Sequence, residues 1–122
     1  MAQLSDNFRF NELCCPCCGA YLANPRLLDA LEALRSELGD VPIHVNSGTR
    51  CPEWNKKVGG VSKSKHLLGE AADIVVRGKE PIEVAKAAES VTQLRNGGVG
   101  VYESFTHVDV GHGASRPARW SG

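Results

Sequence analysis

A carboxylate lies inside a short apolar segment of the chain, and this feature limits how the chain can fold. The segment Ala71–Val76 reads Ala-Ala-Asp-Ile-Val-Val, with Asp73 at its third position. An apolar run of this length predicts a buried β-strand. Burying a carboxylate is unfavourable unless it binds a metal ion or another partner. We therefore expect the fold to supply a partner for Asp73.

One candidate partner precedes the strand. His66 stands at the end of a Gly/Ser-rich stretch, residues 59–65, which predicts a loop. Gly69 allows the chain to turn between His66 and Asp73, so both side chains can face one point.

A second candidate lies near the C-terminus, in the sequence Phe-Thr-His-Val-Asp-Val of residues 105–110. Alternation along a strand places Val108 and Val110 on one face and His107 and Asp109 on the other. We expect the apolar face to meet the core and the His/Asp face to line an open cleft. Two histidines and one aspartate suit a catalytic zinc ion, because three protein ligands leave a fourth position for water.

The remaining pattern predicts an α+β domain with an antiparallel sheet and helices packed on one side. Helices are predicted at residues 25–39 and 81–94, with a short one through Trp54. Strands are predicted at 41–46 and 71–76, followed by a hairpin of 97–102 and 105–110. The segment from Gly111 onward is predicted to be a tail that packs through Trp120.

Bulk properties narrow the classes of function. The 122 residues suit a single domain, 1–122, with a Cys-rich N-terminal arm over 1–24. Lys and Arg together number 14, as do Asp and Glu, which predicts no nucleic-acid or membrane partner and is compatible with a monomer. The first residues show no signal-peptide pattern, so we expect synthesis in the cytoplasm.

Five cysteines are the least settled feature of the sequence. The segment Cys15-Pro16-Cys17-Cys18-Gly19 resembles half of a zinc knuckle, which needs further ligands, and Cys51 is one candidate. A disulfide from the cluster to Cys51 is an alternative, and unpaired packing thiols are another. Cys14 completes the set.

Several of these segments together resemble the M15 zinc peptidases, over nearly the whole chain from about Phe8 to Trp120. The likeness is to the small, phage-type branch related to D-Ala-D-Ala carboxypeptidases and cell-wall endopeptidases. The motifs that carry it are Ser47-Gly48-Thr49-Arg50, Asn55, Gly59-Gly60, Ser62, Ser64, His66 to Ile74, His107-Val108-Asp109-Val110 and Arg119-Trp120. The implied fold is that of Hedgehog domains and D-Ala-D-Ala peptidases.

The resemblance implies roles for individual residues. Zinc would be held by His66, Asp73 and His107. Arg50 would receive carboxylate or carbonyl oxygens of the substrate, for which its planar fork is suited, although a structural salt bridge is the alternative. Ser64 would bond near the metal or the substrate, or else cap its loop.

The general base is not evident. Many relatives carry an acidic residue three positions before the last zinc histidine, where this chain has Ser104. Glu103 and Asp109 are the nearby carboxylates. We favour Glu103 as the base and Asp109 as a residue that orients a ligand histidine.

The resemblance implies a zinc-dependent peptidase acting on peptidoglycan stem peptides or cross-bridges. It leaves open whether the enzyme is a carboxypeptidase or an endopeptidase. Such a protein would reach the cell wall after release or as part of a phage particle. The alternative is a non-catalytic, zinc-containing binding module of the same fold, as Hedgehog domains illustrate.

Overall fold

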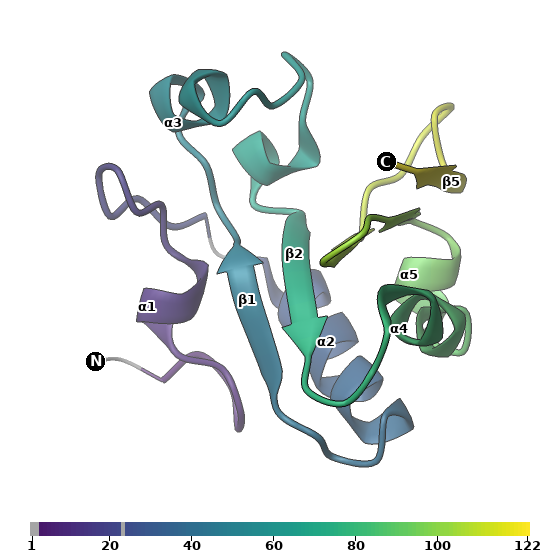
Figure 1. Ribbon diagram of the computed structural model, residues 1–122. Helices are drawn as coiled ribbons and strands as arrows, with labels where there is room; N and C mark the ends of the chain where they lie inside the picture. The colour runs from purple at the N-terminus through teal and green to yellow at the C-terminus, as the bar shows by residue number, and fades with distance from the viewer. Residues whose placement is uncertain (1–2, 23) are drawn as a thin grey trace.

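The computed structural model describes residues 3–22 and 24–122, which form a five-stranded sheet with helices (Figure 1). The strands lie in the order β1-β2-β4-β3-β5. Their bounds are Ile43–Ser47 for β1, Ala71–Val76 for β2, Gly98–Val101 for β3, Thr106–Asp109 for β4 and Ala118–Ser121 for β5.

Helices surround this sheet unevenly (Figure 1). Helix α2 lies behind it, α4 and α5 lie beside β3 and β4, and α3 and the 3-10 helix η1 lie near the end where β2 begins. Their bounds are Phe10–Leu13 for α1, Pro25–Glu37 for α2, Pro52–Lys57 for α3, Lys65–Leu68 for η1, Pro81–Ala88 for α4 and Thr92–Arg95 for α5. Helix α1 packs near β1.

Local chemistry explains why α2 begins and ends where it does. The Asn24 side chain accepts hydrogen bonds from the backbone of Arg26 and Leu27, and Pro25 occupies the first turn. The helix gives way to Gly39, which has a φ of 83° that favours glycine. The predicted helix is thereby confirmed, although its last regular residue is Glu37.

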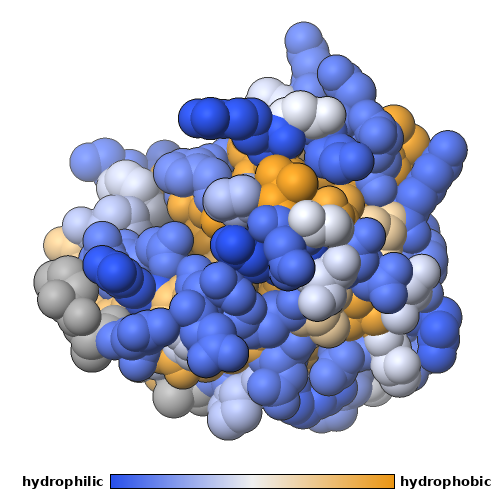
Figure 2. All heavy atoms as spheres, turned by 90° about the horizontal axis from the view of Figure 1, so that it is seen from below, coloured by the Kyte–Doolittle hydropathy of each residue, from blue (hydrophilic) through white to orange (hydrophobic). Residues whose placement is uncertain are grey.

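The core lies between the sheet and these helices. Strand residues of one parity point toward it, including Val45, Ile74 and Val108, which are all buried. Leu31 and Leu34 of α2 are fully buried and belong to the same cluster. Figure 2 shows a largely hydrophilic surface from below, with apolar side chains reaching it in limited areas. The opposite face of the sheet carries its polar residues, among them Asp73, His107 and Asp109.

The structure corrects two predicted elements and adds two. Residues 81–94 are not one helix. Val91, which lies between α4 and α5 in the sequence, adopts an extended conformation, and its side chain is buried in the core. The tail contains strand β5, which pairs in parallel with β3, so the sheet is mixed rather than wholly antiparallel. Helix α1 and η1 were not predicted; both are only four residues long.

None of the helices in residues 3–22 and 24–122 combines the length and the apolar character that crossing a membrane requires.

We expect Leu31→Ala to lower the free energy of unfolding by about 2–5 kcal/mol, because it removes a fully buried side chain and leaves a cavity. Urea unfolding followed by circular dichroism measures this change. Ile82→Ala is the matched control: Ile82 is half exposed on α4, and its truncation should change stability by less than about 1 kcal/mol. Equal effects of the two substitutions would contradict the assigned core.

Candidate functional site

The site is built on one transverse row of residues across the sheet. Backbone pairing aligns Ser47 with Asp73, Asp73 with His107, His107 with Gly100, and Gly100 with Trp120. Residues aligned in this way point to the same face of a sheet. The register therefore brings β1, β2, β4, β3 and β5 to a single polar location, on the face opposite the core helices.

His66 enters this location from η1. The Ser64 side chain accepts a hydrogen bond from the His66 backbone N–H at 3.2 Å and thereby caps the short helix. Nδ1 of His66 lies 2.7 Å from the carbonyl oxygen of Gly48. Because a carbonyl only accepts, Nδ1 carries a ring proton, and in the neutral ring, the form that binds metals, Nε2 keeps its lone pair.

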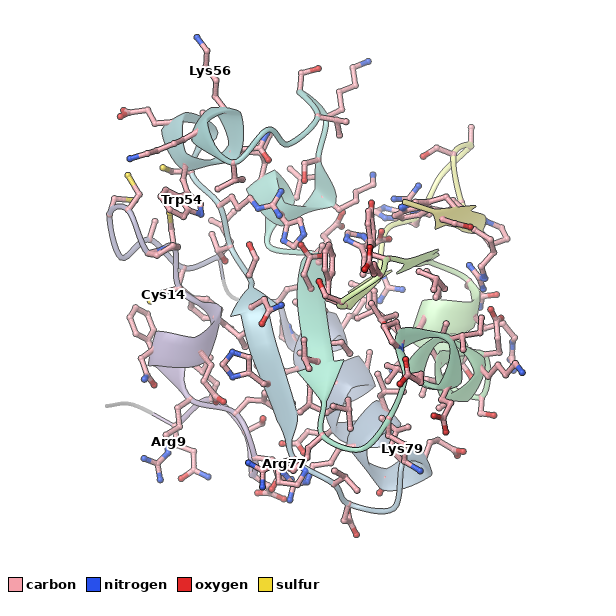
Figure 3. The ribbon with its side chains drawn as sticks, in the orientation of Figure 1. Arg9, Cys14, Trp54, Lys56, Arg77 and Lys79 are labelled. Atoms are coloured by element: carbon pink, nitrogen blue, oxygen red, sulfur yellow. The ribbon has the colours of Figure 1, made fainter. Side chains whose placement is uncertain are left out.

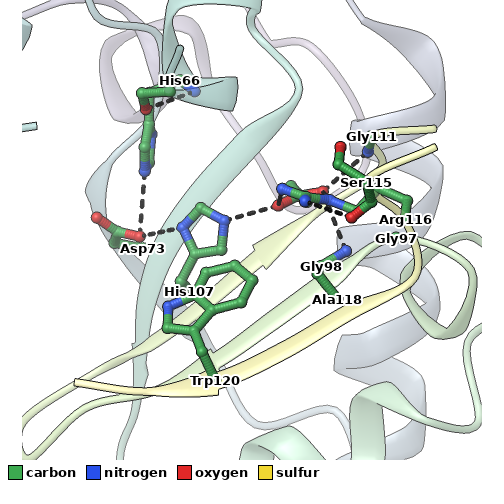
Figure 4. Close-up of polar contacts among 12 residues, drawn as sticks. His66, Asp73, Gly97, Gly98, His107, Gly111, Ser115, Arg116, Ala118 and Trp120 are labelled. Carbon is green, nitrogen blue, oxygen red and sulfur yellow. Dashed lines mark hydrogen bonds and ion pairs between the residues drawn. The ribbon is translucent and has the colours of Figure 1, made fainter. Parts of the chain in front are cut away.

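That lone pair faces another acceptor. Nε2 of His66 lies 3.1 Å from Oδ1 of Asp73, yet it has no hydrogen-bond partner among the described residues, although it is buried. Nδ1 of His107 lies 2.9 Å from the same oxygen (Figure 4). One ligand atom from each of His66, Asp73 and His107 lies within 4.8 Å of the others. Electron-rich atoms gathered in this way fit a cation.

Asp109 holds His107 from its other side. Oδ2 of Asp109 lies 2.8 Å from Nε2 of His107, which donates to it. Arg116 donates to both oxygens of Asp109 at 2.9 Å, and the backbone N–H groups of Gly98 and Gly111 donate to Oδ1. Figure 4 shows this chain of contacts from His66 to Arg116. Asp109 thus fixes which ring nitrogen of His107 faces Asp73.

These contacts shift the pKa values of Asp73, Asp109 and His107. Burial alone raises the pKa of each carboxyl group, but hydrogen bonds with His107 and further donors hold the pKa of Asp73 and that of Asp109 well below their usual range. Burial lowers the pKa of His107, but Asp109 and Asp73 outweigh it and raise that pKa above its ordinary value. Both carboxylates are therefore ionised at neutral pH.

Arg50 lies against the same centre. Its guanidinium donates to Oγ of Ser47 at 3.0 Å, to Oδ1 of Asn55 at 3.2 Å and to Oδ2 of Asp73 at 3.0 Å. The salt bridge considered as an alternative is therefore present. A guanidinium has five N–H donors, so two remain for another acceptor. Arg50 also lines the cleft, where a ligand can reach it.

A cleft of about 420 Å³ opens over the row. Its lining includes His66, Asp73 and His107, and it includes Ser64 as well. Four basic residues line it, namely Arg50, Lys63, Lys65 and Arg116, whereas Asp73 is its one acidic lining residue among those that the structure describes. The cleft is therefore suited to an anionic ligand.

Neither of the two candidates for general base lines the cleft. Glu103 is exposed in the turn between β3 and β4, and it is not among the residues that line the cleft. Asp109 is completely buried, so the expectation that it lines an open cleft is wrong. The alternation placed it on the correct face of β4, but Arg116 covers it there.

Sequence reasoning missed two contributors to the cleft. Arg116 follows a Gly-rich segment without periodicity, so nothing local connected it to Asp109. Trp120 was expected only to pack the tail, but its ring lies 5.0 Å from that of His107, and its Nε1 donates to the Tyr102 hydroxyl. Gly100 pairs with Trp120 in the row, and any side chain at position 100 would collide with the indole ring. The close approach of Trp120 to His107 could therefore be predicted only once the strand register was known.

Two other histidines lie apart from the centre. His44 is exposed on β1. The side chain of His112 is largely exposed, with Nδ1 3.9 Å from Oε2 of Glu70.

Comparison with known proteins shows that this chain is similar to one protein family and to several characterised relatives. The sequence model described as Peptidase M15 matches residues 6–109. Zinc D-Ala-D-Ala carboxypeptidase of Streptomyces albus G is 38% identical over 85 residues, covering 68% of this chain and 33% of that protein. Peptidoglycan L,D-endopeptidase MepK of Escherichia coli K12 is 35% identical over 96 residues, covering 72% of this chain and 51% of that protein. The chain thus spans no more than about half the length of these relatives.

We expect His66→Ala and Asp73→Asn each to lower the metal content by about one ion per chain, because each removes one of three ligands. Asp109→Asn should retain the ion but weaken its affinity by about 10–100-fold, since it loosens His107. Elemental analysis and competition with a chelating dye measure the two effects.

Glu103→Gln is the control for this series, because Glu103 is exposed and outside the cleft. Its metal content should equal that of the unsubstituted protein. Undiminished metal content in His66→Ala would contradict the proposed ligand set, provided that circular dichroism shows a folded chain.

Proposed function

The chain belongs to the peptidase M15 family, and from this premise we propose that it is a zinc-dependent peptidase that hydrolyses peptide bonds of bacterial peptidoglycan. The observation that carries the proposal is the meeting of His66, Asp73 and His107 at the floor of a positively charged cleft. Relatives that carry the names zinc D-Ala-D-Ala carboxypeptidase and peptidoglycan L,D-endopeptidase support the reaction and the substrate class.

The donor set supports zinc as the metal. Two imidazole nitrogens and one carboxylate oxygen form a common catalytic zinc set, and they leave a position open for the reacting groups. We propose His66, Asp73 and His107 as the ligands. When bound, zinc polarises the scissile carbonyl group and makes water a stronger nucleophile at neutral pH.

Arg50 and Arg116 would bind and orient the substrate. Each guanidinium lines the cleft and is held in place by a carboxylate, Asp73 in one case and Asp109 in the other. The remaining N–H groups of Arg50 can donate to a peptide carboxylate or stabilise charge that develops on the carbonyl oxygen. Ser64 lies in the lining and adds a hydroxyl group there.

The base that we propose is Glu103. Asp109 already accepts five hydrogen bonds and is buried, which leaves it no position for a water molecule. Glu103 lies in the turn next to Tyr102, which lines the cleft. It would accept a proton from the attacking water and donate it to the leaving amine.

The exposure of Glu103 also favours a second candidate function, a zinc-containing binding module without turnover. A carboxylate outside the cleft is poorly placed for proton transfer unless the turn moves. In this alternative the zinc centre organises a peptide-binding cleft but does not cleave the peptide.

The proposal extends to how the protein works as a unit. We propose that residues 1–122 act as one peptidase domain and as a monomer, because the chain by itself brings together all three proposed metal ligands. Its site of action would be the cell wall, reached after release from the cell or on a phage particle. Neither nucleic acid nor a membrane would be a partner.

We expect the zinc-loaded protein to release soluble peptide fragments from purified peptidoglycan, and chelation should abolish this release. Mass spectrometry of the fragments distinguishes loss of a terminal D-Ala from cleavage of an internal bond. Zinc binding without any fragment release would contradict the enzyme and support the binding module.

Glu103→Gln should lower kcat by about 10²–10⁴-fold while the metal content stays unchanged, because it removes a proton acceptor and no ligand. Asp109→Asn should lower activity together with metal affinity, and added zinc should restore part of it. Full activity in Glu103→Gln would exclude Glu103 as the base.

A further inference from the structure

Three cysteine sulfurs meet at a second location, away from the His66 centre. Sγ atoms of Cys15, Cys18 and Cys51 all lie within 4.8 Å of one another. All five cysteines of the chain are free thiols. Figure 3 shows sulfur atoms gathered where the N-terminal loop meets α3, whereas Cys14 lies apart, beside α1.

The backbone around Cys15 forms a tight turn. The Gly19 N–H donates to the Cys15 carbonyl at 2.8 Å, and the Cys15 N–H donates to the Ala20 carbonyl at 2.7 Å. Gly19 has a φ of 75°, which favours glycine. Cys15 and Cys18 are three residues apart, which is the ligand spacing of zinc knuckles. The segment is thus shaped to present two sulfurs on the same side.

A backbone amide is directed at the Cys15 sulfur. The Cys51 N–H donates to Sγ of Cys15 at 3.5 Å. N–H groups directed at a sulfur stabilise the thiolate, the form that binds a metal. Sγ of Cys51 accepts in turn from the Trp54 N–H at 3.4 Å.

We propose that Cys15, Cys18 and Cys51 bind a structural zinc ion, with Cys17 as the fourth ligand. Cys17 is exposed and lies in the same turn, next to Cys18 in the sequence, although its sulfur is not in the group of three. Four thiolates satisfy a closed tetrahedral site, and binding releases the thiol protons to solvent. A disulfide would join only two of the three neighbouring sulfurs, whereas a metal ion uses all of them.

This second zinc ion would connect two parts of the chain that support the cleft. The arm already contacts the turn before Cys51: the Thr49 N–H donates to the Leu13 carbonyl at 2.8 Å, and the Leu22 N–H donates to Thr49 Oγ1 at 3.3 Å. The same turn carries Gly48, whose carbonyl orients His66, and Arg50. Fixing Cys51 therefore fixes both groups.

The test separates the two metal sites by using His66→Ala as the background. This variant should retain about one zinc ion per chain in elemental analysis after purification under reducing conditions. Adding Cys51→Ser or Cys18→Ser should reduce the content to near zero. Adding Cys14→Ser, the matched control at a neighbouring cysteine outside the group, should leave it unchanged. A zinc-free His66→Ala protein with reduced thiols would overturn the proposal.

A second measurement uses the unsubstituted chain, so that it does not depend on the folding of variants. In the zinc-loaded protein, alkylation should modify Cys14 and spare the other four cysteines, and chelation with unfolding should expose all five. Intact mass distinguishes thiols from a disulfide. Equal alkylation of all five before chelation, or a disulfide to Cys51, would overturn the proposal. These readouts do not depend on hydrolysis, so failure of the proposed peptidase activity would leave them unaffected.

Discussion

A buried, ionised aspartate is the constraint on which the rest of the site depends. Asp73 lies on an interior strand of the sheet, where a carboxylate without partners would destabilise the fold. Arg50 donates to one of its oxygens, and His66 and His107 place ring nitrogens about 3 Å from the other, so three different segments of the chain converge on this carboxylate. Removing Arg50 would leave a buried carboxylate without its cation, so this contact also holds the adjoining turn to strand β2.

The register of the sheet determines which side chains line the cleft beside Asp73. Because Asp73 pairs with His107, and His107 with Gly100, the side chains of adjacent strands lie in one row. The absence of a side chain at Gly100 lets Trp120 of the parallel edge strand lie against His107. A shift of one residue in either pairing would send His107 or Trp120 to the helix face. Because packing of the valines in the core fixes the strand register, it also fixes the positions of the side chains on the polar face.

The features that were predicted correctly from the sequence are those that depend on residues close together along the chain. Strand β2 has the expected bounds, because an apolar run is a local signal. The loop glycine and the strand alternation indicated only that His66, Asp73 and His107 could face a shared point. Their grouping as one set was implied by the resemblance to the M15 peptidases, and the structure brings the three together. Two features could not be predicted in this way. Arg116 covers Asp109, and β5 pairs with β3, but no local sequence pattern specifies either contact. The break at Val91 is a similar case, since burial in the core overrides the helical pattern there.

Charge balance shows why this centre would favour an anionic ligand once it holds a metal ion. Its two ionised carboxylates, Asp73 and Asp109, are matched by two guanidinium groups, those of Arg50 and Arg116. With both histidines neutral, a divalent metal ion therefore adds two positive charges that no side chain of the centre compensates. Lys63 and Lys65 at the cleft add to that excess. In the proposed peptidase, a peptide carboxylate entering the cleft would restore the balance, and the field that attracts it would depend on metal binding. We therefore expect substrate binding and metal binding to be thermodynamically linked, although the net charge of the whole chain is zero.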